Sequence, residues 1–485
     1  MYKIIKKYDG VVVFAILLVI LCISSFSRVL DVNDELWNFS NVYKMSNGFT
    51  IYKECNVIIT PLFFYVGNIL FKIFGANYLV FRIYGLLINV FLYLAIYKLF
   101  KTLNIRKGKS FLYTFSILNI TRTINFFGAN YNNLAILLAI IGIILMLKKK
   151  SNIIQGIIIF LIFMTKQNIG IYYALGISLY KFWAYKDIKR TVKEIGIEFI
   201  SVIILFSSYL LYLHFSGNLY YYIDMTFCGV SEFAQKNIFI QVESLLELLL
   251  LAVILVFSYI VIVNKKINIS EEKKDTIRLL FCVGLTFNLI SYPLFNTAHI
   301  VLGSIFSIIC FIYVMESILL SDILRKSKVI NVISIIIVGI FALVSICLQF
   351  NNLVAEGNIE YAKPYLGVKV LPDTGKDIDE ICNYVKKNDN NGINTIILSC
   401  NADLYMNMLN RTNNKFDLPF PGNLGSEGEN GIINELKNLK NTQVLLLKDG
   451  MKYQESEKIW NFVADNFKKI GEVGNYYIYV TSDMQ

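Results

Sequence analysis

The hydrophobic positions of this chain gather into blocks of membrane-spanning length instead of alternating with polar ones. Such blocks cover residues 11–23, 79–99, 195–213 and 329–348. A helix that is apolar on all faces over about 18 residues is typical of a membrane span, because lipid surrounds it. The pattern predicts an all-α polytopic membrane domain over residues 1–350, with about eleven transmembrane helices and interfacial helices in its first outer loop.

The pattern changes after residue 350. Residues 351–485 are polar, and short strand-like runs at 395–398, 444–447 and 476–479 alternate there with amphipathic helices at 378–387, 432–439 and 455–467. Alternation of strands and helices over this length predicts a small α/β domain with a few-stranded sheet. We expect this domain to cap the membrane domain or to position an acceptor, without catalytic residues of its own.

Composition supports the membrane interpretation, and charge gives its orientation. The chain is 56% hydrophobic and 17% charged, whereas a soluble domain is about a quarter charged. The net charge is +11, and its basic residues cluster in short segments: 98–109, 148–150, 181–190, 265–274 and 325–328. Basic segments between spans mark the cytoplasmic side, so the charge indicates topology and not a nucleic-acid partner.

The remaining loops carry few basic residues and are therefore predicted to face outward: 27–59, 125–133, 165–168, 215–239 and 292–299. The N-terminus is predicted to be cytoplasmic, with the first block retained as a span because no small-residue cleavage site follows it. The C-terminal domain is predicted to be extracytoplasmic. A span over 61–74 would place the basic segment 98–109 outside, so 61–74 is predicted to be a re-entrant or interfacial helix.

Cysteine and histidine usage narrows the chemistry. The eight cysteines are scattered and form no CxxC pair, and His214 and His299 are the two histidines of the chain. A zinc site built on several imidazoles is therefore excluded.

The first outer segment carries the densest candidate chemistry. Asp31, Asp34 and Glu35 stand within five residues just after the first block. On a helix, Asp31 and Glu35 share a face and Asp34 lies beside them. Closely spaced carboxylates suit a general base or a metal site. They equally suit a solvated loop that begins a helix, so spacing alone leaves both interpretations open.

The residues that follow extend this segment into a longer series: Gly48, Tyr52, Lys53 and Glu54, then Thr60-Pro61-Leu62, Phe74-Gly75 and Arg82. The series resembles the GT-C superfamily of polyprenyl-phosphate-sugar-dependent glycosyltransferases, in its protein-mannosyltransferase and aminoarabinose-transferase-like branch. Asp34-Glu35 stands where that branch has an acidic DE pair after its first span. The resemblance is strongest over residues 28–100, and it extends more weakly to Thr165-Lys166 and to Tyr292-Pro293 with His299.

Two departures from the family pattern are visible. The family often has Pro-Pro or Lys-Pro-Pro where this chain has Thr60-Pro61. Many members carry an acidic residue in the second outer loop, whereas residues 128–133 here supply asparagine amides. The second departure leaves a metal site open, because Mg²⁺ and other hard cations favour carboxylate oxygens.

The resemblance implies an enzyme of the cell membrane, in the bacterial cell envelope. It would move a sugar from a polyprenyl-phosphate donor to an acceptor hydroxyl of a glycan, lipid or protein on the outer face. Asp34 is the candidate base and Glu35 the second candidate catalytic residue, and the pair is also the candidate site for a divalent cation, Mg²⁺ or Mn²⁺.

A developing phosphate needs cationic or hydrogen-bonding partners. Lys166, Arg82 and His299 are the candidates for this task, and the second-tier site residues are Asp31, Glu54, Asn132 and Asn133. Charge counting alone places the following residues on the outer side: Asp31, Asp34, Glu35, Glu54, Asn132, Lys166 and His299. The alternative interpretations are a snorkelling lysine, an arginine that anchors its span and an interfacial histidine satisfied by the backbone.

The alternative function is a non-enzymatic transporter or a flippase for lipid-linked sugars. It would explain the spans and their polar residues. It would not explain the acidic first outer segment or the C-terminal domain.

Overall fold

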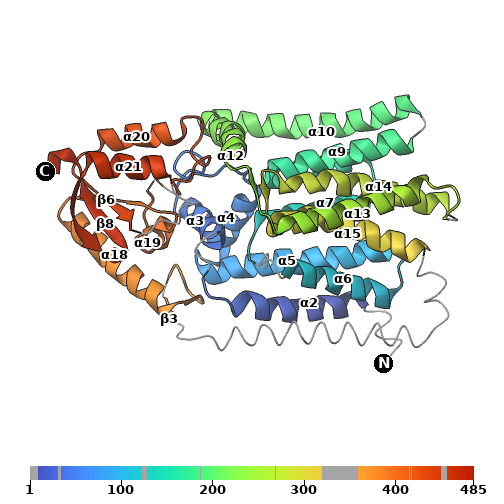
Figure 1. Ribbon diagram of the computed structural model, residues 1–485, viewed down its shortest axis with the longest axis horizontal. Coiled ribbons are helices and arrows are strands. Elements are labelled where there is room, and N and C mark those ends of the chain that lie inside the picture. The colour runs from blue at the N-terminus through green and yellow to red at the C-terminus, as the bar shows by residue number, and fades with distance from the viewer. Residues whose placement is uncertain are drawn as a thin grey trace. The chain divides into compact units, whose positions relative to one another are not determined.

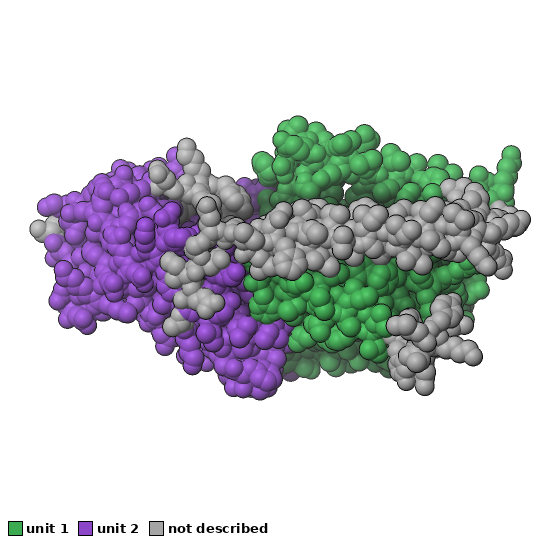
Figure 2. All heavy atoms as spheres, turned by 90° about the horizontal axis from the view of Figure 1, so that it is seen from below, with its two compact units in different colours: residues 1–27, 85–209, 238–353 green, residues 28–84, 210–237, 354–485 purple. Residues whose placement is uncertain are grey.

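The computed structural model describes residues 9–30, 34–122, 128–185, 187–267, 269–318, 359–361, 363–413, 416, 418–448 and 456–484. The chain divides into two compact units, which Figure 2 shows in different colours. Unit 1 comprises residues 1–27, 85–209 and 238–353, and unit 2 comprises residues 28–84, 210–237 and 354–485. The predicted boundary at residue 350 and the predicted span over 329–348 lie outside the described residues.

Unit 1 is helical. Its helices are α2 (Asp9–Phe26), the greater part of α5 (Tyr78–Thr102), α6 (Lys107–Arg122), α7 (Tyr131–Leu147), α8 (Asn152–Thr165), α9 (Gln167–Ala184), most of α10 (Ile188–Phe215), α13 (Ser244–Val263), α14 (Glu271–Phe287) and α15 (Thr297–Ile318). Helix α14 packs against α9, α15 and α13, and α13 also packs against α15. Figure 1 shows these helices running alongside one another. A short 3-10 turn (Asn288–Ser291) and the parallel two-residue pair of β1 (Phe239–Ile240) with β2 (Leu294–Phe295) complete the described part of the unit.

Five of the described helices are long and apolar enough to cross a membrane: α2, α5, α10, α13 and α15. In the most apolar 18-residue stretch of each helix, only 6% of α10 and 22% of α13 is buried inside the protein. Apolar side chains exposed to this extent fit a lipid surrounding and would be unfavourable in water. Several apolar helices in one chain bear out the prediction of a multi-pass membrane protein, while the count of about eleven spans stays a prediction.

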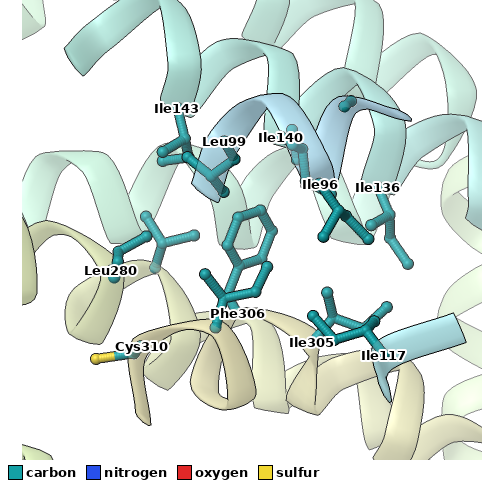
Figure 3. Close-up of a cluster of buried hydrophobic side chains, with 14 of the residues drawn as sticks. Ile96, Leu99, Ile117, Ile136, Ile140, Ile143, Leu280, Ile305, Phe306 and Cys310 are labelled. Carbon is teal, nitrogen blue, oxygen red and sulfur yellow. The ribbon is translucent and has the colours of Figure 1, made fainter. Parts of the chain in front are cut away.

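The core of unit 1 consists of aliphatic and aromatic side chains from many helices. Figure 3 shows part of it, where Phe306 of α15 lies among Leu99 of α5, Ile140 of α7 and Leu280 of α14. These four side chains are fully buried. Close packing of such side chains is what joins helices inside lipid, where burial from water no longer drives association.

Unit 2 combines three segments that are far apart in the sequence. The first contributes α3 (Asp34–Ser46), α4 (Leu62–Phe74) and the start of α5, and the second contributes α11 (Leu219–Ile223), a π-helical turn η1 (Asp224–Gly229) and α12 (Val230–Lys236). The third is the C-terminal segment with its sheet and helices. Helix α4 has 13 residues, fewer than the roughly 20 that a span needs. The re-entrant or interfacial placement of this helix stays a prediction.

The C-terminal segment forms the predicted small α/β fold. Its elements are β3 (Ile359–Glu360), β4 (Lys369–Val370), α18 (Pro372–Asn390), β5 (Asn394–Leu398), α19 (Ala402–Met408), α20 (Gly428–Asn438), β6 (Thr442–Leu447), α21 (Glu457–Asn466), β7 (Lys468–Val473), β8 (Tyr476–Val480) and a terminal 3-10 turn (Ser482–Met484). The four-stranded sheet has the order β5-β6-β8-β7, in which β5 and β6 are parallel and the other pairs antiparallel. All three predicted strands lie in it.

An aromatic cluster joins α3 to the C-terminal segment within unit 2. The Phe39 ring lies 4.5 Å from Tyr78, 5.6 Å from Phe81 and 5.9 Å from Tyr365, measured between ring centroids. Phe39, Tyr78, Phe81 and Tyr365 are fully buried. Burial of large rings is a strong source of stability, so this cluster fixes α3 against the start of α5 and residue 365.

Candidate active site

The predicted acidic pair lies in the first turn of α3. Asp34 is exposed and Glu35 is buried, with 6% of its surface accessible. Acidic side chains are favoured in this turn because the N-terminus of a helix carries a partial positive charge. Asp31, the third carboxylate of the segment, lies outside the described residues.

Glu35 forms a buried two-point ion pair with Arg82 of α5. The Arg82 Nε donates to Glu35 Oε1 and the Nη2 donates to Oε2, each at 3.2 Å. The guanidinium also donates to the backbone carbonyls of Arg28 at 2.9 Å and Val29 at 3.2 Å. One arginine therefore holds both the second acid of the pair and the backbone that leads into it.

These contacts change the expected roles of the two residues. Arg82 is a predicted contact of the donor phosphate, but four of its five guanidinium N–H groups donate to Glu35 and to two backbone carbonyls. The arrangement favours a positioning role for Arg82 and for Glu35. Asp34, the exposed member of the pair, is the carboxylate that remains suited to act as a base.

The far end of α3 is tied to α19 of the C-terminal segment. The Lys44 ammonium lies 2.5 Å from Asp403 Oδ1, and the two side chains are only 1% and 7% exposed. The Asn407 amide donates to the Ser40 hydroxyl at 2.6 Å. A buried lysine is costly unless a carboxylate compensates its charge, so the Lys44–Asp403 pair fixes which part of α19 meets α3.

Residues 364–369 hold the backbone just before the acidic turn and at the start of α5. Leu30 N–H donates to the Lys369 carbonyl and Tyr78 N–H donates to the Pro364 carbonyl, each at 2.8 Å. The Tyr365 hydroxyl donates to the Leu404 carbonyl at 2.9 Å. Burial raises the pKa of the Tyr365 phenol well above its usual range, which keeps it a neutral donor.

Glu54, a second-tier candidate, has a local structural role. Its Oε2 accepts from Thr50 N–H at 2.6 Å while its own N–H donates to the Thr50 carbonyl at 2.9 Å. The neighbouring Tyr52 is buried, has a φ of 68° and donates through its hydroxyl to the Ile59 carbonyl at 2.9 Å. The Gly48–Glu54 part of the sequence series thus fixes the conformation of the loop after α3.

A second group of predicted residues lies together in unit 1. The Lys166 ammonium donates to Asn132 Oδ1 at 2.7 Å and lies 5.2 Å from the centroid of the Tyr131 ring. His299, whose Nδ1 lies 2.8 Å from Asn296 Oδ1, is near enough to Lys166 for the ammonium to oppose a positive charge on the imidazole. A lysine, a histidine and an amide grouped in this way can present positive charge and hydrogen bonds to an anion.

Asn133 stands apart from this group. Its Nδ2 donates to Asn89 Oδ1 at 2.8 Å, which ties the start of α7 to α5. Of the predicted site residues, the structure therefore places Asp34, Glu35, Arg82 and Glu54 in unit 2 and Lys166, Asn132, Asn133 and His299 in unit 1.

The expected cation site stays a prediction, because Asp31 lies outside the described residues and the carboxylates within them do not complete such a site. Among the described residues, no group of three or more His, Cys, Asp or Glu side chains is placed to hold a metal ion. Both oxygens of Glu35 accept hydrogen bonds from Arg82. Asp34 alone is a weak ligand set for Mg²⁺ or Mn²⁺, and we derive no chemical step through a metal.

Sequence reasoning missed three buried polar residues of unit 2: Asn38, Lys44 and Asp403. Lys44 and Asp403 are 359 residues apart in the sequence, so no local pattern connects them. Asn38 carried a usable signal, because it falls one helical turn after Asp34 on the predicted helix.

Comparisons with protein-family models and with curated protein sequences find no match. Solved structures do match over the full length. ArnT, an aminoarabinose transferase from Cupriavidus metallidurans, matches in its apo state with a TM-score of 0.56 and 9% identity, covering 99% of each chain. The same protein bound to undecaprenyl phosphate matches with a TM-score of 0.62 and 8% identity, over 97% of this chain and 98% of that one.

The Archaeoglobus fulgidus oligosaccharyltransferase, in a complex with Zn and sulfate, matches with a TM-score of 0.51 and 11% identity. This match covers 96% of the present chain and 73% of the archaeal one. At such identities the likeness establishes the fold, which is the fold that the resemblance over residues 28–100 implies.

Proposed function

We propose that this chain, which has the GT-C fold, is a membrane glycosyltransferase that moves a sugar from a polyprenyl-phosphate donor to an acceptor hydroxyl. The observation that carries the proposal is the full-length likeness to ArnT, which has been seen with undecaprenyl phosphate bound. A fold alone does not define a function. The proposal is supported by the acidic turn of α3, where a sequence resemblance to the same superfamily had placed the candidate base.

In the proposed reaction the acceptor oxygen attacks the anomeric carbon of the donor sugar. A new carbon–oxygen bond forms there while the bond between that carbon and the lipid phosphate oxygen breaks. The electron pair of the broken bond leaves with the phosphate, and the hydroxyl proton passes to the Asp34 carboxylate. A positioned base of this kind contributes about 10²- to 10⁴-fold to a rate.

Glu35 and Arg82 support Asp34 by fixing the first turn of α3. The Glu35 carboxylate is turned to Arg82, and Arg82 also holds the carbonyls of Arg28 and Val29. A base that must meet a hydroxyl gains from such fixation, because a displacement of about 1 Å can cost 10²-fold in rate.

Lys166 and His299 are the proposed contacts to the lipid phosphate. They form the grouped cation and imidazole of unit 1, with Asn132 beside them. The negative charge that develops on the leaving phosphate would be stabilised by hydrogen bonds from this group.

We also propose that unit 2 lies on the outer side of the membrane. Charge counting assigns the first outer segment, residues 215–239 and the C-terminal domain to that side, and the structure gathers these three segments into one unit. Segments that pack together outside the spans must lie on the same side, so the two observations support each other.

The experiment that tests the function is a transfer assay with purified protein and undecaprenyl-phosphate-linked sugars. Membranes of the cells that produce the protein supply the acceptor. The wild type is expected to release undecaprenyl phosphate and to label the acceptor fraction with the sugar. Labelled sugar that stays on the lipid with every donor would contradict the proposal.

A further inference from the structure

Helix α3 is buried although many of its side chains are polar. Five polar residues of the helix are buried: Glu35, Asn38, Ser40, Asn41 and Lys44. Taking a polar group out of water is unfavourable unless a hydrogen bond replaces the lost contact with water. Each of these side chains therefore needs a partner in the folded protein.

Four of the five have one. Glu35 accepts from Arg82, Ser40 from Asn407, Lys44 donates to Asp403, and the Asn41 amide donates to the Trp37 carbonyl at 2.9 Å. These contacts satisfy the buried polar groups on the side of α3 that meets Arg82 and on the side that meets α19.

Asn38 is the exception. Asn38 is only 1% exposed, and neither its Oδ1 nor its Nδ2 has a hydrogen-bond partner in the described part of the chain. Asn388 of α18 shows the usual case, because its buried amide donates to Thr395 at 3.1 Å and to Gln443 at 2.8 Å. An amide left without partners lowers stability, which points to a ligand that completes it.

The position of Asn38 places it with the candidate base. It follows Asp34 by four residues, so the two side chains lie about 40° apart around the helix and one turn apart along it. The carboxylate of Glu35 is turned to Arg82. Asp34 is exposed and Asn38 is buried, so this face of α3 runs from the protein surface into its interior.

The amide also restricts the chemistry of its ligand. It offers N–H donors and a carbonyl acceptor, and here both are unmatched. An ionised phosphate only accepts hydrogen bonds, so it would leave Oδ1 of Asn38 without a donor. A lipid tail would leave both Oδ1 and Nδ2 without a partner. A sugar hydroxyl donates and accepts, so it satisfies both halves of the amide.

We infer that Asn38 binds a hydroxyl of the donor sugar and is a specificity-determining residue of the site. The inference rests on the proposed function. It adds that recognition of the sugar, as distinct from the phosphate and the lipid, takes place on the Asp34–Asn38 face of α3.

The test measures thermal unfolding of wild type, Asn38→Leu and the matched control Asn388→Leu. Each is unfolded alone, with undecaprenyl phosphate, and with a panel of undecaprenyl-phosphate-linked hexoses and pentoses. Without ligand, Asn38→Leu is expected to unfold at the wild-type temperature or higher. Asn388→Leu is expected to lose several degrees, because it removes the buried hydrogen bonds to Thr395 and Gln443.

With ligand, undecaprenyl phosphate should raise the unfolding temperature of wild type and Asn38→Leu equally. A sugar-bearing donor should raise the unfolding temperature of the wild type further than undecaprenyl phosphate does, and this additional rise should be lost in Asn38→Leu. The rate of sugar transfer by Asn38→Leu should be about 10- to 100-fold slower than that of the wild type. Asn38→Ala, which removes the amide without adding bulk, should lose the same additional rise.

Three results would overturn the inference. If Asn38→Leu loses as much stability without ligand as Asn388→Leu does, the Asn38 amide stabilises the fold and does not serve a ligand. Variants that keep the additional rise from the sugar would show that Asn38 does not bind it, while the proposed function stands. A wild type that neither transfers sugar nor gains stability from undecaprenyl phosphate would overturn the proposed function and the inference together.

Discussion

Asp34 and Glu35 are neighbours in the sequence but have different surroundings. Consecutive side chains on a helix point about 100° apart, and that of Glu35 reaches Arg82. Glu35 is buried and doubly hydrogen-bonded, while Asp34 is exposed. In the proposed reaction, Glu35 therefore fixes the turn and Asp34 takes the proton.

The first prediction concerns the Glu35–Arg82 pair. Glu35→Gln removes the negative charge from a buried ion pair with the Arg82 guanidinium. Breaking such a pair costs about 3–5 kcal/mol of folding free energy, so the unfolding temperature should fall by several degrees. Thermal unfolding of the purified protein measures this.

The control for that prediction is Glu472→Gln. Glu472 lies 2.6 Å from Lys448 and 3.0 Å from Lys469, and its side chain is 48% exposed. Water screens exposed pairs, so this variant should unfold at the wild-type temperature. Equal losses for the two variants would show that burial of the Glu35–Arg82 pair has no consequence for stability.

At the scale of elements, the connection between α19 and α20 fits closely against η1. The backbone N–H of Ser426 donates to Asp224 Oδ1 at 2.9 Å. Gly425 has a φ of +69°, and a Cβ atom built on it would overlap the Asp224 carboxylate. This position needs glycine for its backbone conformation and for the space that the carboxylate occupies.

The second prediction compares two glycines of similar conformation. Gly392 has a φ of +71° with nothing near its missing Cβ, whereas Gly425 is crowded. Gly392→Ala should cost only backbone strain, about 1–2 kcal/mol. Gly425→Ala should cost more, because it also displaces Asp224 from Ser426. Thermal unfolding of the two variants measures this difference. Equal losses in unfolding temperature would contradict a close contact between Gly425 and Asp224.

Local patterns predicted several elements of the C-terminal domain. The strands β5, β6 and β8 and the helices α18, α20 and α21 have the apolar periodicity that identified them. Strand β7 was not predicted from the sequence, because it is an edge strand with mostly exposed side chains, including Lys468, Lys469 and Glu472. Charged edge strands resist aggregation, but they lack the alternating pattern.

The candidate site was predictable in its residues but not in its pairings. The sequence series named Glu35 and Arg82 as separate site residues, and 47 positions separate them. Their ion pair depends on how α5 packs beside α3, which no local period encodes. For the same reason the sequence did not reveal that Asn38 alone lacks a partner among the buried polar residues of α3.

At the scale of the whole molecule, the composition of unit 2 makes topology testable. The third prediction is that Cys228, an exposed cysteine of η1, reacts with a membrane-impermeant maleimide on intact cells. Cys228→Ser should lose this label. A cysteine introduced in place of Lys149, on the predicted cytoplasmic side, should stay protected until the cells are opened. Labelling of the Lys149 position together with protection of Cys228 would invert the topology.

The central claim is that the exposed acid of α3 takes the proton of the acceptor in a sugar transfer. The matched comparison is Asp34→Asn against Asp373→Asn, because Asp373 is also an exposed acid in the first turn of a helix of unit 2. Both variants should fold like the wild type.

The most direct measurement is the rate at which purified protein moves radiolabelled sugar from undecaprenyl phosphate to the acceptor fraction. The account predicts that Asp34→Asn slows this rate by about 100-fold or more and that Asp373→Asn leaves it unchanged. An Asp34→Asn protein with near wild-type transfer would contradict the assignment of Asp34 as the base.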